Sequence, residues 1–248
     1  MDALCSAILA EKPKKLTLAE RSGMGNTRGV LETRGVIALA EDRGFSTVVL
    51  DELERTGWRE IQAPVLHWSR GFFLASVVAQ ADRVIQTCCL KTHRFGGHFT
   101  MSLKNSVGLI AKRVPKVNYD FMGELHSSPH QRLMIAEINK FYRTDLIVMD
   151  ATEGFATGGP DTGKLIHPEV IIAGSDRVAI DAVGVALLRS YGTMRDVMEG
   201  RIFEQEQIAR AVQLGVGVAS AEDIRLFPLD KTAESVAGRI QVQLDADR

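Results

Sequence analysis

Residues 89 to 110, CLKTHRFGGHFTMSLKNSVGLI, gather groups that bind anions and contain no carboxylate. The side chains of this stretch that we expect to hold the anion, by charge or by hydrogen bonds, are Lys91, His93, Thr100, Lys104 and Asn105. Ammonium and imidazole groups are the usual partners of carboxylates and phosphates in proteins. The segment therefore predicts a site for a small anionic molecule, with Lys104, His93 and Asp150 as the candidate catalytic residues.

The positive charge of the chain is concentrated around this segment. Residues 83 to 119 hold seven Lys or Arg and no Asp or Glu, whereas the rest of the chain holds 23 basic and 31 acidic residues. A solvated surface usually mixes both signs of charge, which this segment does not. Lys104 stands between the apolar runs FTMSL and VGLI, so it is expected to be partly buried and to need an anionic partner. The alternative is that Lys104 pairs with an internal carboxylate and has a structural role.

Carboxylates follow two later apolar runs and suggest a second kind of chemistry. Asp150 comes at the end of one run, and Asp176 and Asp181 follow another. These side chains could hold a divalent metal ion or supply a base. Asp176 could equally cap the helix that follows it. His93 and His98 could ligate a metal or serve as structural hydrogen-bonding groups.

Glycine-rich loops are the third group of candidates. Ser22 and Gly23 lie in RSGMGN, and Gly159 lies in GGPDTG. Backbone N–H groups in such loops can approach an anion closely, although both stretches could also be ordinary turns. Neither loop has the spacing of a dinucleotide-binding fingerprint or a P-loop.

Composition narrows the class of protein. The chain has 248 residues, is 45% hydrophobic and carries a formal net charge of -1, which gives no general reason to expect binding to nucleic acid or to a membrane. No apolar run is long enough to cross a bilayer, and no secretory signal is apparent, so a cytoplasmic location is expected. The three cysteines cannot supply four thiolates, so no iron–sulfur cluster is expected. The oligomeric state is left open.

Short apolar runs alternate with amphipathic stretches along the chain. Strands are expected at 14–20, 46–52, 83–90, 144–151, 169–175 and 223–229, and helices at 28–44, 71–81, 127–142, 177–192 and 203–215. This alternation predicts a single α/β domain over residues 1–248, with a mostly parallel open sheet and helices on both faces. Ligands bind such sheets beyond the carboxyl ends of the strands, where most of the candidate residues fall.

Three stretches together resemble the domain-of-unknown-function 362 family, over about residues 1–192. They are LKTHRFGGHFTMSLKNSVGLI, VMDATEGFATGGPDTGK and AGSDRVAIDAVGVALL. The positions that carry the resemblance include Lys91, His93, Thr100, Lys104, Asn105, Gly108, Asp150, Gly159, Pro160, Asp176 and Asp181. Many members of that family carry ferredoxin-type cysteine motifs, which this chain lacks. The family has no settled activity, so the resemblance implies the position of the site and not its chemistry.

Two classes of function fit these observations. The first is an enzyme that binds a small carboxylate or phosphate and performs proton transfer or metal-assisted chemistry. The second is a non-catalytic accessory or ligand-sensing protein that docks on a redox or maturation partner. Turnover of a small acid would distinguish them.

Overall fold

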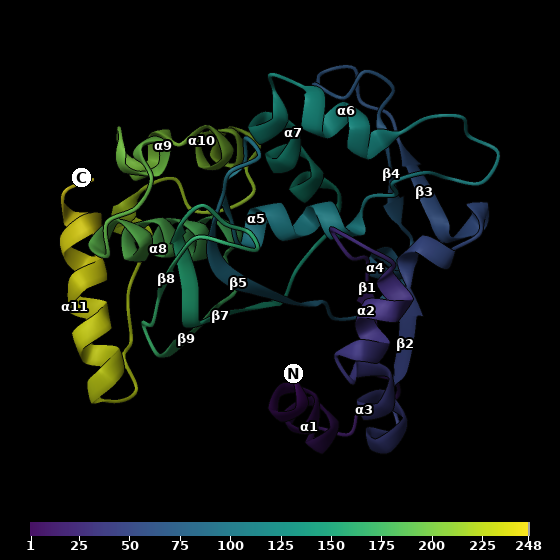
Figure 1. Cartoon of the computed structure of the whole chain (residues 1–248), viewed down its shortest axis with the longest axis horizontal. Coiled ribbons are helices and arrows are strands. Elements are labelled where there is room, and N and C mark those ends of the chain that lie inside the picture. The colour runs from purple at the N-terminus through teal and green to yellow at the C-terminus, as the bar shows by residue number, and fades with distance from the viewer. Residues whose placement is uncertain (248) are drawn as a thin grey trace. The chain divides into compact units, whose positions relative to one another are not determined.

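All but one of the predicted strands form, and they fall in two separate units of the chain (Figure 1). The structure, a computed structural model, describes residues 1–247. The first unit comprises Met1–Gln62, Gly71–Val77 and Gly108–Phe121. The second unit comprises Ala63–Arg70, Val78–Val107 and the chain from Met122 onward.

The first unit contains two small sheets. In the first, β1 and β2 run parallel, and in the second β3 and β4 run antiparallel. Cys5, Ala40 and Phe45 form a small buried cluster in this unit. Its helices and strands are α1 (Asp2–Ala10), β1 (Thr17–Glu20), α2 (Thr27–Thr33), α3 (Val36–Arg43), β2 (Ser46–Val49), β3 (Trp58–Ile61) and β4 (Phe72–Ala75), with 3-10 turns η1 (Leu50–Glu52) and η2 (Arg55–Gly57).

The second unit is built on one sheet with the strand order β6-β5-β7-β8, in which β9 also pairs with β7. Its strands are β5 (Ile85–His93), β6 (His98–Thr100), β7 (Leu146–Thr157), β8 (Lys164–Ile166) and β9 (Val170–Gly174). Its helices are α4 (Val77–Gln80), α5 (Ser102–Asn105), α6 (Phe121–Ser127), α7 (Gln131–Ile138), α8 (Arg177–Ser190), α9 (Arg195–Met198), α10 (Glu206–Gln213) and α11 (Lys231–Asp245). The 3-10 turns η3 (Ser106–Leu109), η4 (Asn139–Phe141), η5 (Ile202–Glu204) and η6 (Ala221–Asp223) connect them.

The prediction of a mostly parallel sheet is wrong. In the second unit only β5 and β7 pair in parallel, and β6, β8 and β9 all pair antiparallel with their neighbours. The connection from β7 to β9 contains only β8 and no crossover helix, so β9 must return in the opposite direction. The sheet is therefore small and mixed.

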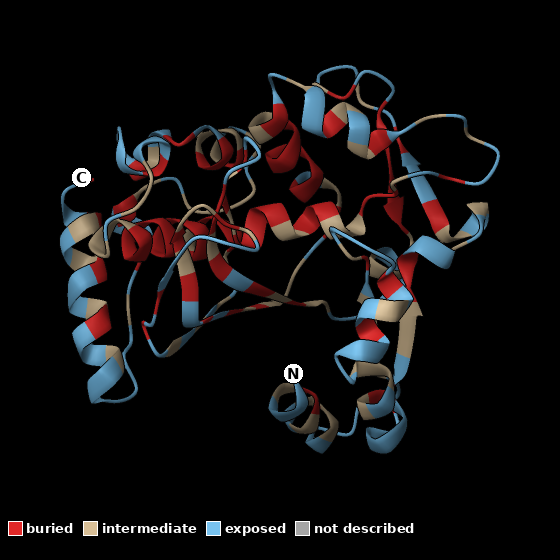
Figure 2. Ribbon diagram, in the orientation of Figure 1, coloured by how far each residue is buried: buried red, intermediate tan, exposed pale blue. Residues whose placement is uncertain are grey.

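Helices cover one face of this sheet, not both as predicted. Buried and more accessible residues alternate along β5 and β7, which is the pattern of a sheet with a single covered face (Figure 2). On the covered side, the largely buried helix α8 contacts β5, β7 and β9. Met149, Val183 and Leu187 belong to the large apolar core that forms there.

Two predicted elements did not form. Residues 71–81, expected to be a helix, contain strand β4 and the short helix α4. The four apolar residues FFLA fit a buried strand as well as a helix, and pairing with β3 decides in favour of the strand. Residues 223–229, expected to be a strand, pair with nothing in the described chain. Pro228 has no N–H to donate there, and Phe227 and Leu229 are exposed.

Candidate functional site

The candidate site lies at the carboxyl end of β5. This strand extends to His93, three residues beyond its predicted end, because β6 folds back and pairs with it. Lys91 is opposite Thr100 in this hairpin, and His93 is opposite His98. Residues 94 to 97 form the turn. The hairpin thus brings four of the predicted polar residues to one end of the sheet.

Gly97 lets the turn approach His93 and Lys104 closely. A methyl group added at Gly97 would lie 2.9 Å from His93 Nδ1 and 2.9 Å from Lys104 Cε. These distances are shorter than real contacts allow, so any larger residue would displace the imidazole or the lysine side chain. His93 and Lys104 are both buried, with 6% and 7% of their surface exposed. The sequence predicted this pair, and the structure brings the two side chains to the same glycine.

The electrostatic environment of His93 is positive. The pKa of His93 is lowered to about 3, mainly by burial and then by the charges of Lys104, His126, Lys91 and Arg94 in that order. The imidazole is therefore neutral at physiological pH and acts through hydrogen bonds. Its Nδ1 atom is buried and has no hydrogen-bond partner among the described residues. A buried ring nitrogen in a positive environment is well suited to an anionic ligand that also carries a hydrogen-bonding group.

Gln131 is a further candidate residue that the sequence did not indicate. It is the first residue of α7, and only 3% of its surface is exposed. A methyl group added at Gly96 would lie 2.6 Å from Gln131 Oε1, so this amide packs against the turn of the hairpin. Its Nε2 atom is buried without a hydrogen-bond partner in the described chain. No local sequence pattern distinguishes a functional glutamine at a helix start, so the sequence alone does not predict it.

The Gly159 loop also lies beside the end of β5. The backbone N–H of Arg94 donates to the carbonyl of Gly158 over 3.0 Å, and its guanidinium donates to Gly159 O and to the Asp161 carboxylate, over 3.0 and 2.6 Å. A methyl group at Gly159 would collide with the carbonyl of Thr92. The loop that was predicted to contribute to the site is therefore attached to the hairpin, with Asp161 neutralising Arg94.

Three further predicted residues lie on the same hairpin or directly after it. Lys91 is partly exposed at the end of β5. The Thr100 hydroxyl is buried and has no partner among the described residues. Asn105 is half-buried at the end of α5, one residue after Lys104.

The three candidate carboxylates each have a local role. Asp150 is exposed on β7 and accepts hydrogen bonds from the backbone N–H and hydroxyl of Thr152, at 2.9 and 2.7 Å. Asp176 caps α8 by accepting from Ala179 N, 2.8 Å away, and it also accepts from Val218 N over 2.9 Å. No group of three or more His, Cys, Asp or Glu within residues 1–247 is placed to hold a metal ion. A metal at Asp176 and Asp181 stays a prediction.

Asp181 is fully buried within α8. Its carboxylate accepts hydrogen bonds from Ser102 N, at 2.6 Å, and from Leu103 N, so it caps the first turn of α5. Gln207 Nε2 lies 3.4 Å from its other oxygen. Burial raises the pKa of Asp181 to about 7, against the opposing effect of these hydrogen bonds. Asp181 thus positions the short helix that carries Lys104.

Ser22 and Gly23 lie in the first unit. The Ser22 backbone N–H donates to the Thr27 hydroxyl over 3.0 Å, and Gly23 has open space where a side chain would be. The Thr27 hydroxyl in turn donates to Asp51, 2.5 Å away. These bonds shape the loop before α2. A role for Ser22 and Gly23 in ligand binding stays a prediction.

Comparison with known proteins bears on the whole of this arrangement. Residues 1–186 match the family model described as Domain of unknown function (DUF362). The chain belongs to this family. The matched region of this DUF362 protein contains β5, β6, α5 and the Gly159 loop, and therefore every residue of the candidate site. No curated protein matches the chain, and no solved structure does. Within the described residues, no helix of this DUF362 protein is both long and apolar enough to span a membrane.

Proposed function

We propose that this DUF362 protein binds a small anionic molecule, a carboxylate or a phosphate, at the end of β5. The observation that supports this most is a group of buried polar side chains with positive charge around it. His93 and Gln131 each have a buried nitrogen atom without a partner in the described chain, and Gly97 brings His93 together with Lys104. A ligand with oxygen atoms at this position would satisfy both nitrogens and balance the charge.

Each residue has a distinct task in this proposal. Lys104 and Lys91 neutralise the ligand, and Gln131 donates a hydrogen bond from Nε2. His93 is neutral when the site is empty, because burial and the neighbouring cations hold its pKa at about 3. A bound anion would raise that pKa, since an opposite charge nearby favours the protonated imidazole. His93 would then exchange a proton with the ligand, which supports chemistry of the proton-transfer type.

A thermal-denaturation screen with inorganic phosphate and small carboxylates tests the proposal. At a ligand concentration one hundred times the dissociation constant, binding adds about 2.7 kcal/mol to the free energy of unfolding. For a chain of this length we expect a rise in melting temperature of about 5–10 °C with at least one anion. Turnover of that anion would assign the protein to the enzymes, and saturable binding without turnover would favour the accessory or ligand-sensing class.

Variants of the buried group provide the decisive comparison. Lys104→Met should abolish the shift, whereas Lys140→Met, at an exposed lysine of the same unit, should leave it unchanged. Gln131→Leu retains side-chain volume without the donor and should weaken binding about tenfold, or by about 1.4 kcal/mol. If no anion shifts the wild-type melting temperature, or if Lys104→Met responds as the wild type does, the proposal is wrong.

A further inference from the structure

Two histidines lie side by side at the start of α7, on residues that the anion site does not use. The ring centroids of His67 and His130 are 4.7 Å apart, and the two rings are tilted by 45°. His67 belongs to the segment Ala63–Arg70, and His130 is the N-cap residue of α7. Both histidines are part of the second unit. Residues far apart in the sequence thus form an adjacent pair of imidazoles.

The carboxylate of Glu137 fixes the orientation of the His67 ring. Its Oε1 atom lies 2.7 Å from His67 Nδ1, and its Oε2 atom accepts from the His67 backbone N–H over 3.0 Å. A carboxylate only accepts hydrogen bonds, so Nδ1 is the donor and the lone pair of the uncharged ring is on Nε2. Glu137 is fully buried in α7. His67 therefore presents a defined nitrogen atom as an electron-pair donor.

The backbones on both sides of the pair are held by hydrogen bonds of their own. Trp68, directly after His67, donates from Nε1 to the carbonyl of Met134 in α7 over 3.2 Å. The His130 N–H donates to Ser128 Oγ over 3.1 Å, and its carbonyl accepts from Met134 N over 2.9 Å. The positions of the two histidines are thus set by the fold, so little ordering is needed when a ligand binds.

Three of the four ring nitrogens have no hydrogen-bond partner among the described residues. They are Nε2 of His67 and both nitrogens of His130. The His67 side chain is 31% exposed and His130 is exposed, so an ion can reach them from solvent. Imidazole nitrogens are the commonest metal ligands in proteins. A metal–nitrogen distance of about 2.1 Å places the centroids of two imidazoles on one ion about 5 Å apart, close to the separation observed here.

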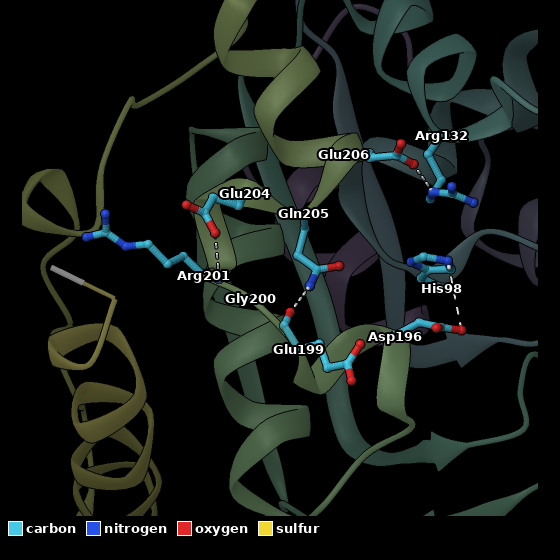
Figure 3. A pocket seen from close by; sticks show the side chains of 9 residues that line it. All are labelled: His98, Arg132, Asp196, Glu199, Gly200, Arg201, Glu204, Gln205 and Glu206. Atoms are coloured by element: carbon cyan, nitrogen blue, oxygen red, sulfur yellow. Dashed lines mark hydrogen bonds and ion pairs between the residues drawn. The ribbon is translucent and has the colours of Figure 1, made fainter.

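The arginines near the pair are already neutralised. Arg210 donates from Nε and Nη2 to Glu137 Oε1, over 3.2 and 2.7 Å. Arg132 of α7 forms an ion pair with Glu206, and Figure 3 shows its guanidinium turned toward that carboxylate. A cation is therefore not opposed by an unbalanced guanidinium, and an anion would find both guanidiniums occupied.

We propose that His67 and His130 bind a divalent transition metal ion of the kind that prefers imidazole, with Zn²⁺ as the ion to test. Glu137 is the outer carboxylate that orients the His67 ligand, an arrangement typical of metal-binding histidines. No group of three His, Cys, Asp or Glu is placed to hold a metal within the described chain, so water completes the coordination. Mg²⁺ prefers oxygen ligands and should not bind. This site does not depend on the proposed anion site.

Isothermal titration calorimetry of the full-length protein without an affinity tag tests this with Zn²⁺ and Mg²⁺. We expect one saturable Zn²⁺ site per chain and no response to Mg²⁺. His130→Ala removes a ligand at an exposed position and should weaken Zn²⁺ binding at least tenfold. Two controls should bind Zn²⁺ as the wild type does. His167→Ala removes an exposed histidine outside the pair, and Cys89→Ser removes the exposed thiol.

Glu137→Gln separates a built site from an adventitious contact of two surface histidines. The amide oxygen can still accept from His67 Nδ1, but the negative charge is lost, and we expect at least tenfold weaker Zn²⁺ binding. Circular dichroism would check that the variant is folded, and if it is not, His130→Ala decides alone. Wild-type affinity in folded Glu137→Gln or in His130→Ala would overturn the proposal. Absence of saturable Zn²⁺ binding, or its loss in Cys89→Ser, would do so as well.

Discussion

At the scale of single residues, Gly97 controls the geometry of the proposed anion site. It lies in the turn between β5 and β6, and the absence of a side chain lets the backbone approach both His93 and Lys104. Position 97 requires glycine because there is no space for a side chain. It does not require an unusual backbone conformation, because Gly97 is not among the glycines with positive φ. Gly96, its neighbour, has a φ of 81° and packs against Gln131, so the two glycines serve different purposes.

Gly97→Ala should therefore impair anion binding more than it impairs folding. The added methyl group would displace the His93 ring or the Lys104 side chain, both 2.9 Å from it. We expect a loss of about 1–3 kcal/mol in the free energy of unfolding. We also expect at least tenfold weaker binding of phosphate or of the carboxylate found in the screen, measured by calorimetry.

Gly238→Ala is the matched control for this substitution. Gly238 lies in α11, with open space where the methyl group would go. Alanine is the better helix former, so this variant should gain about 0.5–1 kcal/mol and bind the anion normally. Normal anion binding by Gly97→Ala would show that the contact with His93 and Lys104 has no part in the site.

At the scale of elements, one carboxylate joins two helices. Asp181 belongs to α8 and caps α5, the short helix that carries Lys104 and Asn105. Two other polar atoms of this region, Ser102 Oγ and Gln207 Oε1, are buried without partners among the described residues. The packing of α5 on α8 thus depends on a carboxyl group that burial makes costly to ionise.

This cost predicts how stability depends on pH. The pKa of Asp181 is about 7 in the folded protein and about 3.8 for an unperturbed carboxyl group. Between these values the folded state retains a proton that the unfolded state has lost, so this group makes stability fall as pH rises through the window. Above pH 7 the cost is fully present and constant.

Asp181→Asn should remove this dependence. The amide oxygen can still accept from Ser102 N, and the amide nitrogen can donate to Gln207 Oε1. We expect the variant to be more stable than the wild type at pH 8 by about 1–3 kcal/mol, and the difference to shrink steadily toward pH 4. Urea denaturation at several pH values would measure it. A constant difference over pH 4–8 would mean that Asp181 does not titrate in this window.

At the scale of the whole molecule, the cysteines are divided between the two units. Cys5 belongs to the first unit, and Cys88 and Cys89 lie next to each other in β5 of the second. Three thiols cannot complete the four-thiolate set of a usual iron–sulfur cluster. Protein purified without oxygen should therefore be colourless, without absorption near 400 nm and without bound iron or sulfide. A brown preparation with stoichiometric iron and sulfide would point to a cluster shared between two chains.

The sequence by itself predicted the candidate site and most of the strands that surround it. The basic stretch without acids around residues 89–110 is a local property, and so are the apolar runs that became β1, β2, β5, β7 and β9. Lys104 stood between two apolar runs, and its burial was expected on that ground and is confirmed. Such features can be predicted from the sequence because they depend on residues that are neighbours in the chain.

Three features could be established only from the tertiary structure. They are the antiparallel direction of β9, the formation of a strand at Phe72–Ala75, and the position of Gln131 beside Gly96. A strand's direction depends on the connection that leads to it, and an apolar run of four residues carries no distinguishing period. Gln131 reaches the site from a helix that begins more than thirty residues after the turn it contacts. Asp181 was predicted from the sequence as a metal ligand, whereas in the structure it caps α5. Which groups a buried carboxylate contacts depends on how the helices pack, and the local sequence does not contain that information.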